Sequence, residues 1–364
     1  MFFLSVCQSM LQKLSQKREK KRMKQRKRAH RFWVLFCLSL TLLSGCGKQE
    51  SEQVTKQTYP EVTIPTHEPI LKPEQKKKME SQQMPINTVV SENASSRTEV
   101  SRNEASEMTE DASVPRELHY IDAWGEWHDT IINENVEKHV YDFALLQNDG
   151  KTISYDDGTY TIRRGIDVSH HQGEIDWQKV RDAGYEFAFL RIAYRGYGEE
   201  GTLNKDRNFD VYLEGARAAG MDVGVYMFSQ AVNEAEAKEE AEYVLKILQG
   251  TALELPVVYD PESIRDDVAR TDSVSGEQFT RNTIVFCDTI RAAGYEPMIY
   301  SNMIWEADLL DLEKLSNYPI WYADYEKIPQ TPYHFSYWQY TSDGNVPGIA
   351  GRVDLDVQFL RKKM

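Results

Sequence analysis

Cysteine is scarce in this chain of 364 residues. Its four cysteines, Cys7, Cys37, Cys46 and Cys287, show no paired spacing and no Cys-x-x-Cys motif. This pattern excludes a disulfide framework and a zinc site built from cysteine pairs. Cys287 falls on the apolar face of a predicted helix, where we expect an inert, buried thiol.

Basic residues are scarce outside the N-terminal region. The first 45 residues carry eleven Lys or Arg and one acidic residue, whereas the whole chain has a net charge of −14. The rest of the chain is therefore more acidic than the total suggests. Such a surface repels nucleic acid, so we expect no nucleic-acid partner.

Long apolar runs are few, and the one near the N-terminus spans 32–43 and follows a basic stretch. It is short for a bilayer span and fits the core of a signal peptide. The adjoining motif Leu43-Ser44-Gly45-Cys46 resembles the lipobox of bacterial lipoproteins. The resemblance implies a signal peptide over 1–45, cleavage before Cys46 and a lipid on its sulfur. The alternative is an uncleaved anchor, and Met23 competes with Met1 as the true start.

Residues 46–117 contain almost no aromatic side chains and are rich in Ser, Glu, Lys, Gln, Thr and Pro. Such a segment cannot bury enough apolar surface to offset its chain entropy, which predicts a disordered tether. Its root-mean-square reach would be roughly 45 Å. Residues 118–162 are predicted to form a small β-rich extension, with a hairpin turn at Asp157-Gly158.

A repeating unit occupies 163–364, in which a helical pattern ends on glycine and a short buried strand follows. The eight predicted strands are 165–169, 187–193, 221–228, 256–260, 297–300, 319–323, 335–340 and 352–355. Eight strands alternating with helices predict an α/β fold, a (β/α) barrel of the TIM type. The barrel should be irregular, because its last connections are too short for full helices.

Paired carboxylates stand at the end of one of these strands, in the run Val257-Val258-Tyr259-Asp260-Pro261-Glu262. Alternation along a strand points Asp260 and Glu262 the same way, which separates their pKa values. One proton donor beside one charged group suits cleavage of a glycosidic bond. A solvated strand end or half of a metal site would give the same pattern.

Other strand ends should bring further polar groups to the same barrel mouth, namely Asp167, Arg191 and Asp354. Aromatic residues lie at the same ends and could stack on sugar rings, although each alone could equally be core filler. The candidates for substrate contact are Arg191, Tyr226, Tyr300, Trp321, Tyr325 and Trp338.

The segment 165–173, Gly-Ile-Asp-Val-Ser-His-His-Gln-Gly, resembles the opening of glycoside hydrolase family 25, the Chalaropsis-type lysozymes. Later motifs of that family follow in order: Tyr226-x-Phe228, Asp260-x-Glu262, Trp321-x-Ala323-x-Tyr325, Trp338-Gln339-Tyr340-Thr341-Ser342 and Gly351-Arg352-Val353-Asp354-Leu355. The resemblance covers about 164–360 and implies an N-acetylmuramidase acting on the β-1,4 bond from N-acetylmuramic acid to N-acetylglucosamine in peptidoglycan.

The resemblance implies that Glu262 is the catalytic acid and base. Asp260 and Asp167 would stabilise positive charge or orient the substrate's acetamido group, and Asp354 would complete a ring of carboxylates. Retention is the implied outcome, with the substrate's N-acetyl group as a possible nucleophile.

Two departures from the family pattern stand out: Pro261 between the paired acids, and Asp356 where Asn is common. If Asp356 faces the site, it should raise neighbouring pKa values.

No metal or other cofactor is expected, because the adjacent His170 and His171 diverge and no further metal-ligand spacing is present.

We expect a monomer on the extracellular face of the membrane, held by its lipid and reaching peptidoglycan strands, for wall turnover or for lysis of other bacteria. Two other functions remain open: a catalytically weak barrel that binds peptidoglycan, and a chitinase-like hydrolase of a β-1,4 N-acetylglucosamine polymer.

Overall fold

The computed structural model describes residues 115–150, 152–265 and 267–363. The chain divides into two compact units, Met1–Glu61 and Val62–Met364, and every described residue belongs to the second. The predicted signal peptide, Cys46 and nearly all of the predicted tether lie outside the described residues. None of the helices in the described part is long and apolar enough to cross a membrane.

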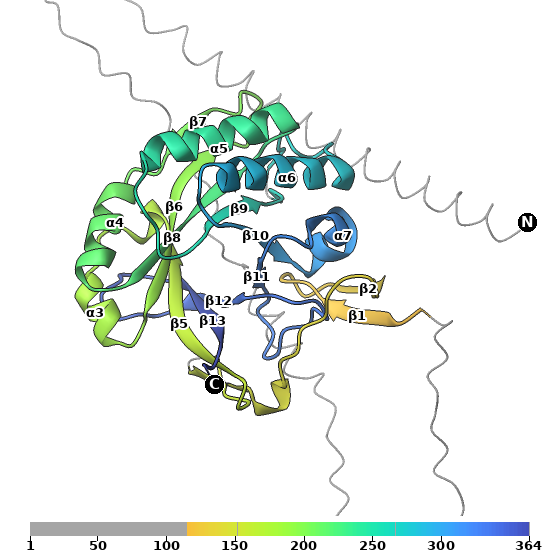
Figure 1. Ribbon diagram of the computed structural model, residues 1–364, viewed down its shortest axis with the longest axis horizontal. Coiled ribbons are helices and arrows are strands. Elements are labelled where there is room, and N and C mark those ends of the chain that lie inside the picture. Colours follow the sequence, from red (N-terminus) through yellow and green to blue (C-terminus); the bar gives the residue numbers. More distant parts are fainter. Residues whose placement is uncertain (1–114, 151, 266, 364) are drawn as a thin grey trace, which may run out of the picture. The chain divides into compact units, whose positions relative to one another are not determined.

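Eight strands form a closed barrel, which confirms the predicted fold (Figure 1). Their order is β5-β13-β12-β11-β10-β9-β8-β6, and the pairing of β5 with β6 closes the ring. A short strand, β7 (Leu203–Lys205), adds to the edge of β6. The barrel strands are β5 (Tyr160–Val168), β6 (Phe187–Arg195), β8 (Asp222–Ser229), β9 (Val257–Pro261), β10 (Pro297–Asn302), β11 (Ile320–Ala323), β12 (Tyr337–Gly344) and β13 (Val353–Arg361).

The last strand breaks the parallel arrangement. Neighbouring strands from β5 through β6 to β12 are parallel, whereas β13 is antiparallel to both β12 and β5. The eight residues between β12 and β13 are too few for a helical crossover, so the chain simply turns back. Asp354 therefore stands near the start of its strand, not at its C-terminal end as predicted. Reversal of the strand still brings it opposite Asp167.

Helices cover the outside of the first part of the barrel (Figure 1). Asn233 caps one of them by accepting a hydrogen bond from the Glu236 amide, and Ser275 caps the next in the same way, as the sequence predicted. The helices are α3 (Trp177–Asp182), α4 (Phe209–Ala218), α5 (Glu234–Leu248), α6 (Gly276–Ala292) and α7 (Leu312–Leu315), with short turns η1 (Phe143–Leu145), η2 (His170–Gln172) and η3 (Trp305–Leu309).

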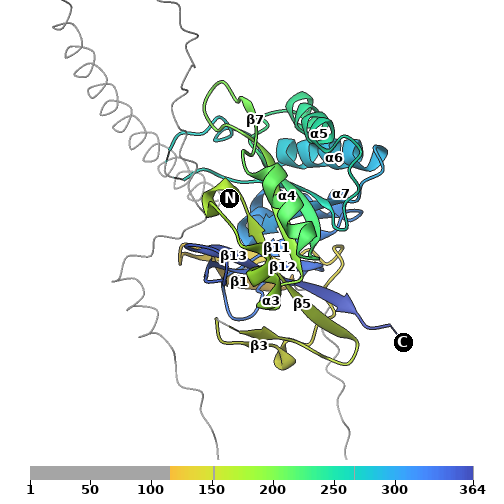
Figure 2. The ribbon, with the colours of Figure 1, turned by 90° about the vertical axis from the view of Figure 1, so that its left-hand side faces the viewer.

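The segment before the barrel packs on the strands that lack long helices. Tyr141 stacks on Phe359 of β13 at 4.2 Å between ring centroids, and its hydroxyl donates to the Phe335 carbonyl at 2.6 Å. The segment contains two small antiparallel pairs, β1 (Glu117–Ile121) with β2 (Trp127–Ile131) and β3 (Gln147–Asn148) with β4 (Ile153–Ser154). Figure 2 shows β3 at the end of the molecule away from α5 and α6.

Aromatic side chains fill the barrel interior. A buried cluster combines Phe187, Phe189, Tyr226, Tyr300 and Trp321, and the Phe189 and Trp321 rings stack at 4.7 Å. Gly224 makes room for one of them, because a Cβ there would lie 2.4 Å from the Phe189 ring. A dense aromatic interior holds the strand ends, and the polar groups on them, in fixed positions.

Candidate active site

Asp260 and Glu262 stand where β9 ends. Asp260 is 2 % exposed, whereas Glu262 is partly exposed and lines a cavity of about 420 Å³. Burial raises the pKa of Asp260 well above its usual range, and the neighbouring Glu262 carboxyl and Asp167 add to the rise. The Glu262 carboxyl therefore lies close enough to Asp260 to raise its pKa, as expected of two acids on one strand face.

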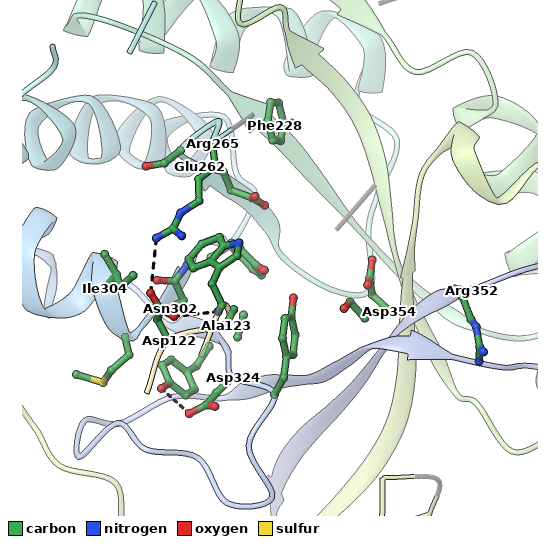
Figure 3. A pocket seen from close by; sticks show the side chains of 18 of the residues that line it. Asp122, Ala123, Phe228, Glu262, Arg265, Asn302, Ile304, Asp324, Arg352 and Asp354 are labelled. Atoms are coloured by element: carbon green, nitrogen blue, oxygen red, sulfur yellow. Dashed lines mark hydrogen bonds and ion pairs between the residues drawn. The ribbon is translucent and has the colours of Figure 1, made fainter. Parts of the chain in front are cut away.

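Glu262 lines the cavity (Figure 3), whereas Asp260 is not among the lining residues. The Oδ1 atom of Asp260 has no hydrogen-bond partner within the described part of the chain. An unsatisfied buried oxygen is costly and is rare outside functional sites. Asp260 is not among the residues that line the cavity, so it can act there only through its neighbours or through its charge.

Asp167, at the end of β5, is oriented by an amide. Gln339 donates from Nε2 to Asp167 Oδ2 at 2.7 Å, and its Oε1 accepts hydrogen bonds from the hydroxyls of Tyr300 and Tyr325 at 2.9 and 3.0 Å. The two tyrosine donors fix the orientation of the amide, so its N–H must point at the carboxylate. Gln339 thus links two cavity-lining tyrosines to a buried acid.

Asp354 and Asp356 add two more carboxyls on β13. Asp354 lines the cavity, and burial followed by the charges of Asp167, Asp356 and Glu262 raises its pKa well above the usual range. Asp356 is fully buried, and its Oδ1 accepts a hydrogen bond from Trp321 Nε1 at 2.9 Å. Burial and Asp167 raise the pKa of Asp356 as well. The charge of Asp356 contributes to the raised pKa of Asp354, which is the direction expected from the sequence.

Arg191 belongs to a second polar network beside the acids. Its Nε donates to Asp206 Oδ2 at 2.9 Å, and its Nη2 lies 2.6 Å from His170 Nδ1. Burial alone would raise the pKa of Asp206, but the hydrogen bond with His170 and the charge of Arg191 lower it to about 2. Arg191 lines the cavity yet is 4 % exposed, so it serves mainly to hold η2 against β6.

His171 faces the cavity from η2. Burial, then the positive charges of His170 and Arg191, lower its pKa to about 4. The ring is therefore neutral near pH 7 and acts as a hydrogen-bonding group, not as a cation. The described residues contain no group of three or more His, Cys, Asp or Glu side chains arranged to hold a metal ion.

Residues 166–349 match the family described as glycosyl hydrolases family 25. The chain belongs to this family. It is 26 % identical over 194 residues to the autolytic lysozyme of Clostridium acetobutylicum, covering 53 % of this chain and 55 % of that protein. It is 29 % identical over 201 residues to lysozyme M1 of Streptomyces globisporus, covering 52 % and 66 %. The chain thus spans between about half and two thirds of these relatives.

Solved structures give similar partial matches. The modular autolysin LytC from Streptococcus pneumoniae is 24 % identical, with a TM-score of 0.48, covering 66 % of this chain and 56 % of that one. A bacterial lysozyme from Streptomyces coelicolor is 26 % identical, with a TM-score of 0.43, covering 55 % and 92 %.

Three aromatic residues predicted for substrate contact do line the cavity of this family 25 domain: Tyr226, Tyr300 and Tyr325. Two do not. Trp321 is 1 % exposed and packs inside the barrel, and its indole N–H is taken by Asp356. Trp338 is fully buried in the main core, and its indole donates to the Asp324 carbonyl at 2.8 Å. Both tryptophans are core residues whose polar atoms are already satisfied.

Several cavity residues were missed in the sequence. Asp324 and Asn302 follow β11 and end β10, where a strand-end search could have found them. Asp122 and Trp124 come from the β1–β2 hairpin, which precedes the segment that matches family 25. Nothing in their local sequence indicates that they reach this cavity.

Proposed function

We propose that this chain is a peptidoglycan hydrolase that cleaves the β-1,4 bond between N-acetylmuramic acid and N-acetylglucosamine. The observation that carries the proposal is the carboxyl pair at the end of β9. One member opens into a cavity large enough for sugar rings, and the other is buried directly behind it. Membership of the lysozyme family supports the same reaction.

Glu262 is the proposed acid and base, because it is the member of the pair that substrate can reach. Its proton passes to the glycosidic oxygen as the bond from the sugar carbon to that oxygen breaks, and the leaving sugar keeps the bond's electrons. Positive charge then develops on the remaining sugar ring. In the second half of the reaction, a water molecule gives a proton back to Glu262 and its oxygen to the sugar carbon.

Asp260 and Asp167 are proposed to act on that charge from behind the cavity wall. Asp167 is 2 % exposed, so its negative potential would be poorly screened by water. Asp260 is equally buried and its raised pKa favours the protonated form, so it would add negative potential only when it releases its proton as the positive charge develops. Asp354, which lines the cavity, is proposed to complete the carboxylate ring and to contact polar groups of the substrate. Retention of configuration, with the N-acetyl group of the substrate as nucleophile, fits an arrangement in which Asp260 itself does not reach the cavity.

Digestion of purified peptidoglycan and of chitin oligomers, with mass spectrometry of the new reducing ends, tests the reaction. The proposal predicts muramic-acid reducing ends from peptidoglycan and no cleavage of chitin. Cleavage of chitin would point to the chitinase-like function instead. If the chain bound peptidoglycan and had its native melting temperature but produced no new reducing ends, the result would point to a barrel that only binds peptidoglycan.

We further propose that the barrel, 163–364, is carried outside the cytoplasm on the tether 46–117, with a lipid on Cys46 and the signal peptide 1–45 removed. A cell-wall substrate requires an extracytoplasmic location. The order of apolar core, small residues and cysteine supports the lipid anchor. A monomer is proposed, since the barrel is already closed and the aromatic extension 118–162 covers the strands that lack long helices.

A further inference from the structure

The β1–β2 hairpin is fixed to the barrel close to the cavity. The Gln330 side chain bonds the backbone of Ile121 in both directions, accepting from its N–H at 2.8 Å and donating to its carbonyl at 2.9 Å. At the other end of the hairpin, the Tyr333 hydroxyl accepts from the Asn133 amide at 2.9 Å. The hairpin is therefore held on both sides of its tip by one loop of the barrel.

The hairpin tip is ordered by a single buried carboxylate. Asp122 Oδ1 accepts hydrogen bonds from the backbone amides of Trp124 and Glu126, each at 2.9 Å. Its Oδ2 lies 3.0 Å from His128 Nε2 and 3.6 Å from Arg265 Nη2, and the side chain is 2 % exposed. Such an arrangement presets the position of Trp124 before anything binds.

Trp124 and Arg265 form a stacked pair on the cavity wall. The Arg265 guanidinium carbon lies 3.4 Å from the centroid of the Trp124 ring, and both residues line the cavity that Glu262 opens into. Trp124 is 36 % exposed although its backbone is fixed. In Figure 3, Arg265 and Asp122 lie on the opposite side of the cavity from Arg352, with Asp354 between them.

We propose that the hairpin tip adds a sugar-binding subsite to the muramidase groove, in which Trp124 stacks against one ring of the glycan strand beyond the two sugars that flank the cleaved bond. The proposal rests on the function proposed above. A rigid, half-exposed indole provides a flat apolar surface at little entropic cost, which suits the apolar face of a sugar ring. Arg265 stacks on the indole in a cation–π contact and brings positive charge to the hairpin side of the cavity.

The positive charge of Arg265 complements the negative charge of the peptidoglycan strand that would bind. Muramic acid carries a lactyl group that continues into an anionic stem peptide, whereas the cavity itself is lined by Glu262, Asp324 and Asp354. The ion pair of Arg265 with Asp122 is long, at 3.6 Å, and the Arg265 side chain is 47 % exposed. The guanidinium therefore keeps donors free to meet a carboxylate of the strand.

Glycan oligomers of increasing length, prepared from peptidoglycan, test the subsite in the full chain. In the wild type, kcat/KM should rise when the oligomer becomes long enough to reach Trp124. Trp124→Ala should reduce that gain about tenfold, mainly through KM, and Trp124→Phe should restore most of it. Trp127→Ala is the matched control, because Trp127 lies on the same hairpin, is 59 % exposed and does not line the cavity.

A binding measurement separates failure of the subsite from failure of the proposed reaction. In a Glu262→Gln chain, in which turnover is expected to be slow, Trp124→Ala should weaken binding of the longest oligomer about tenfold, and Trp127→Ala should not. Unchanged affinity and unchanged length dependence in Trp124→Ala, at an unchanged melting temperature, would overturn the subsite. Absence of cleavage by the wild type at every length would overturn the reaction alone.

Discussion

At the scale of single residues, the carboxyl groups of this chain differ sharply in what surrounds them. Asp206 is held ionised by His170 and Arg191, whereas Asp260 and Asp354 lie among other acids and are buried. Clustered acids cannot all be charged at once, so at least one of these carboxyl groups should keep a proton close to where a glycosidic oxygen would need one.

Asp356 offers a direct test of this coupling. Asp356→Asn keeps the oxygen that accepts from Trp321 and removes a charge that raises the pKa of Asp354. The pKa of Asp354 should therefore fall, and the acid limb of kcat/KM against pH should move to lower pH. The pH–rate profile of the purified variant measures the shift. Movement of the limb to higher pH, or no movement, would contradict the coupling.

Glu306 predicts how stability depends on pH. It is buried on η3, and burial, with a contribution from the charge of Asp324, raises its pKa to about 8. The folded state keeps this proton up to about pH 8, whereas the unfolded chain releases it near 4.5, so stability falls as pH rises through that window. The slope from this one group is up to about 1.4 kcal/mol per pH unit.

Glu306→Gln removes that titration while its amide oxygen can still accept from the Thr331 hydroxyl. Denaturant unfolding at several pH values between 5 and 8 should give a flatter stability profile than the wild type. The exposed Glu277→Gln is the control and should leave the slope unchanged. An equally steep fall in the Glu306→Gln chain would show that other groups cause it.

At the scale of elements, tight packing inside the barrel limits the size of the side chains that the strands can accommodate. A Cβ added at Gly224 would lie 2.4 Å from the Phe189 ring and 2.9 Å from the Leu255 Cβ. Gly224→Ala should therefore lower the free energy of unfolding by roughly 1–3 kcal/mol. Gly198→Ala, with no atom within 4 Å of its added Cβ, should change it little. Equal stabilities of the two variants would contradict the packing argument.

Hydrophobic patterning predicted all eight barrel strands, because each is a short buried run that follows a glycine-capped helix or a turn. It also predicted that Asp260 and Glu262 share a face, which alternation alone determines. It did not predict the direction of β13, because direction depends on how a short connection folds back. Nor did it separate Trp321 and Trp338 from the cavity tyrosines, since burial at a strand end depends on neighbouring strands.

The hairpin shows the other limit of prediction from sequence. Nothing in the sequence assigns Trp124 a partner, yet it contacts Arg265, which lies far along the chain and shortly after β9. Contacts between distant segments with no shared pattern emerge only from the tertiary fold. The same is true of Gln339, whose role depends on two tyrosines from other elements.

At the scale of the whole molecule, the proposed lipid anchor decides where the barrel works. Cys46→Ala should abolish acylation and either release the protein from membranes or leave it unprocessed. Metabolic labelling with a fatty acid, followed by fractionation of cells, measures both effects. Cys287→Ala is the control, because that thiol is buried in the barrel core. A Cys46→Ala protein that still carried the label would contradict the anchor.

The central claim is that Glu262 transfers the proton at the cleaved bond. Glu262→Gln is nearly isosteric, so melting temperature and binding of cell walls should largely persist. Because the amide can neither give nor take a proton as a carboxyl does, the rate of release of muramic-acid reducing ends from peptidoglycan should fall by ~10²–10⁴-fold. Glu254→Gln is the matched control, since Glu254 lies just before β9, at the end of the strand away from the acids. Release at a near wild-type rate by a well-folded Glu262→Gln chain would contradict the assignment.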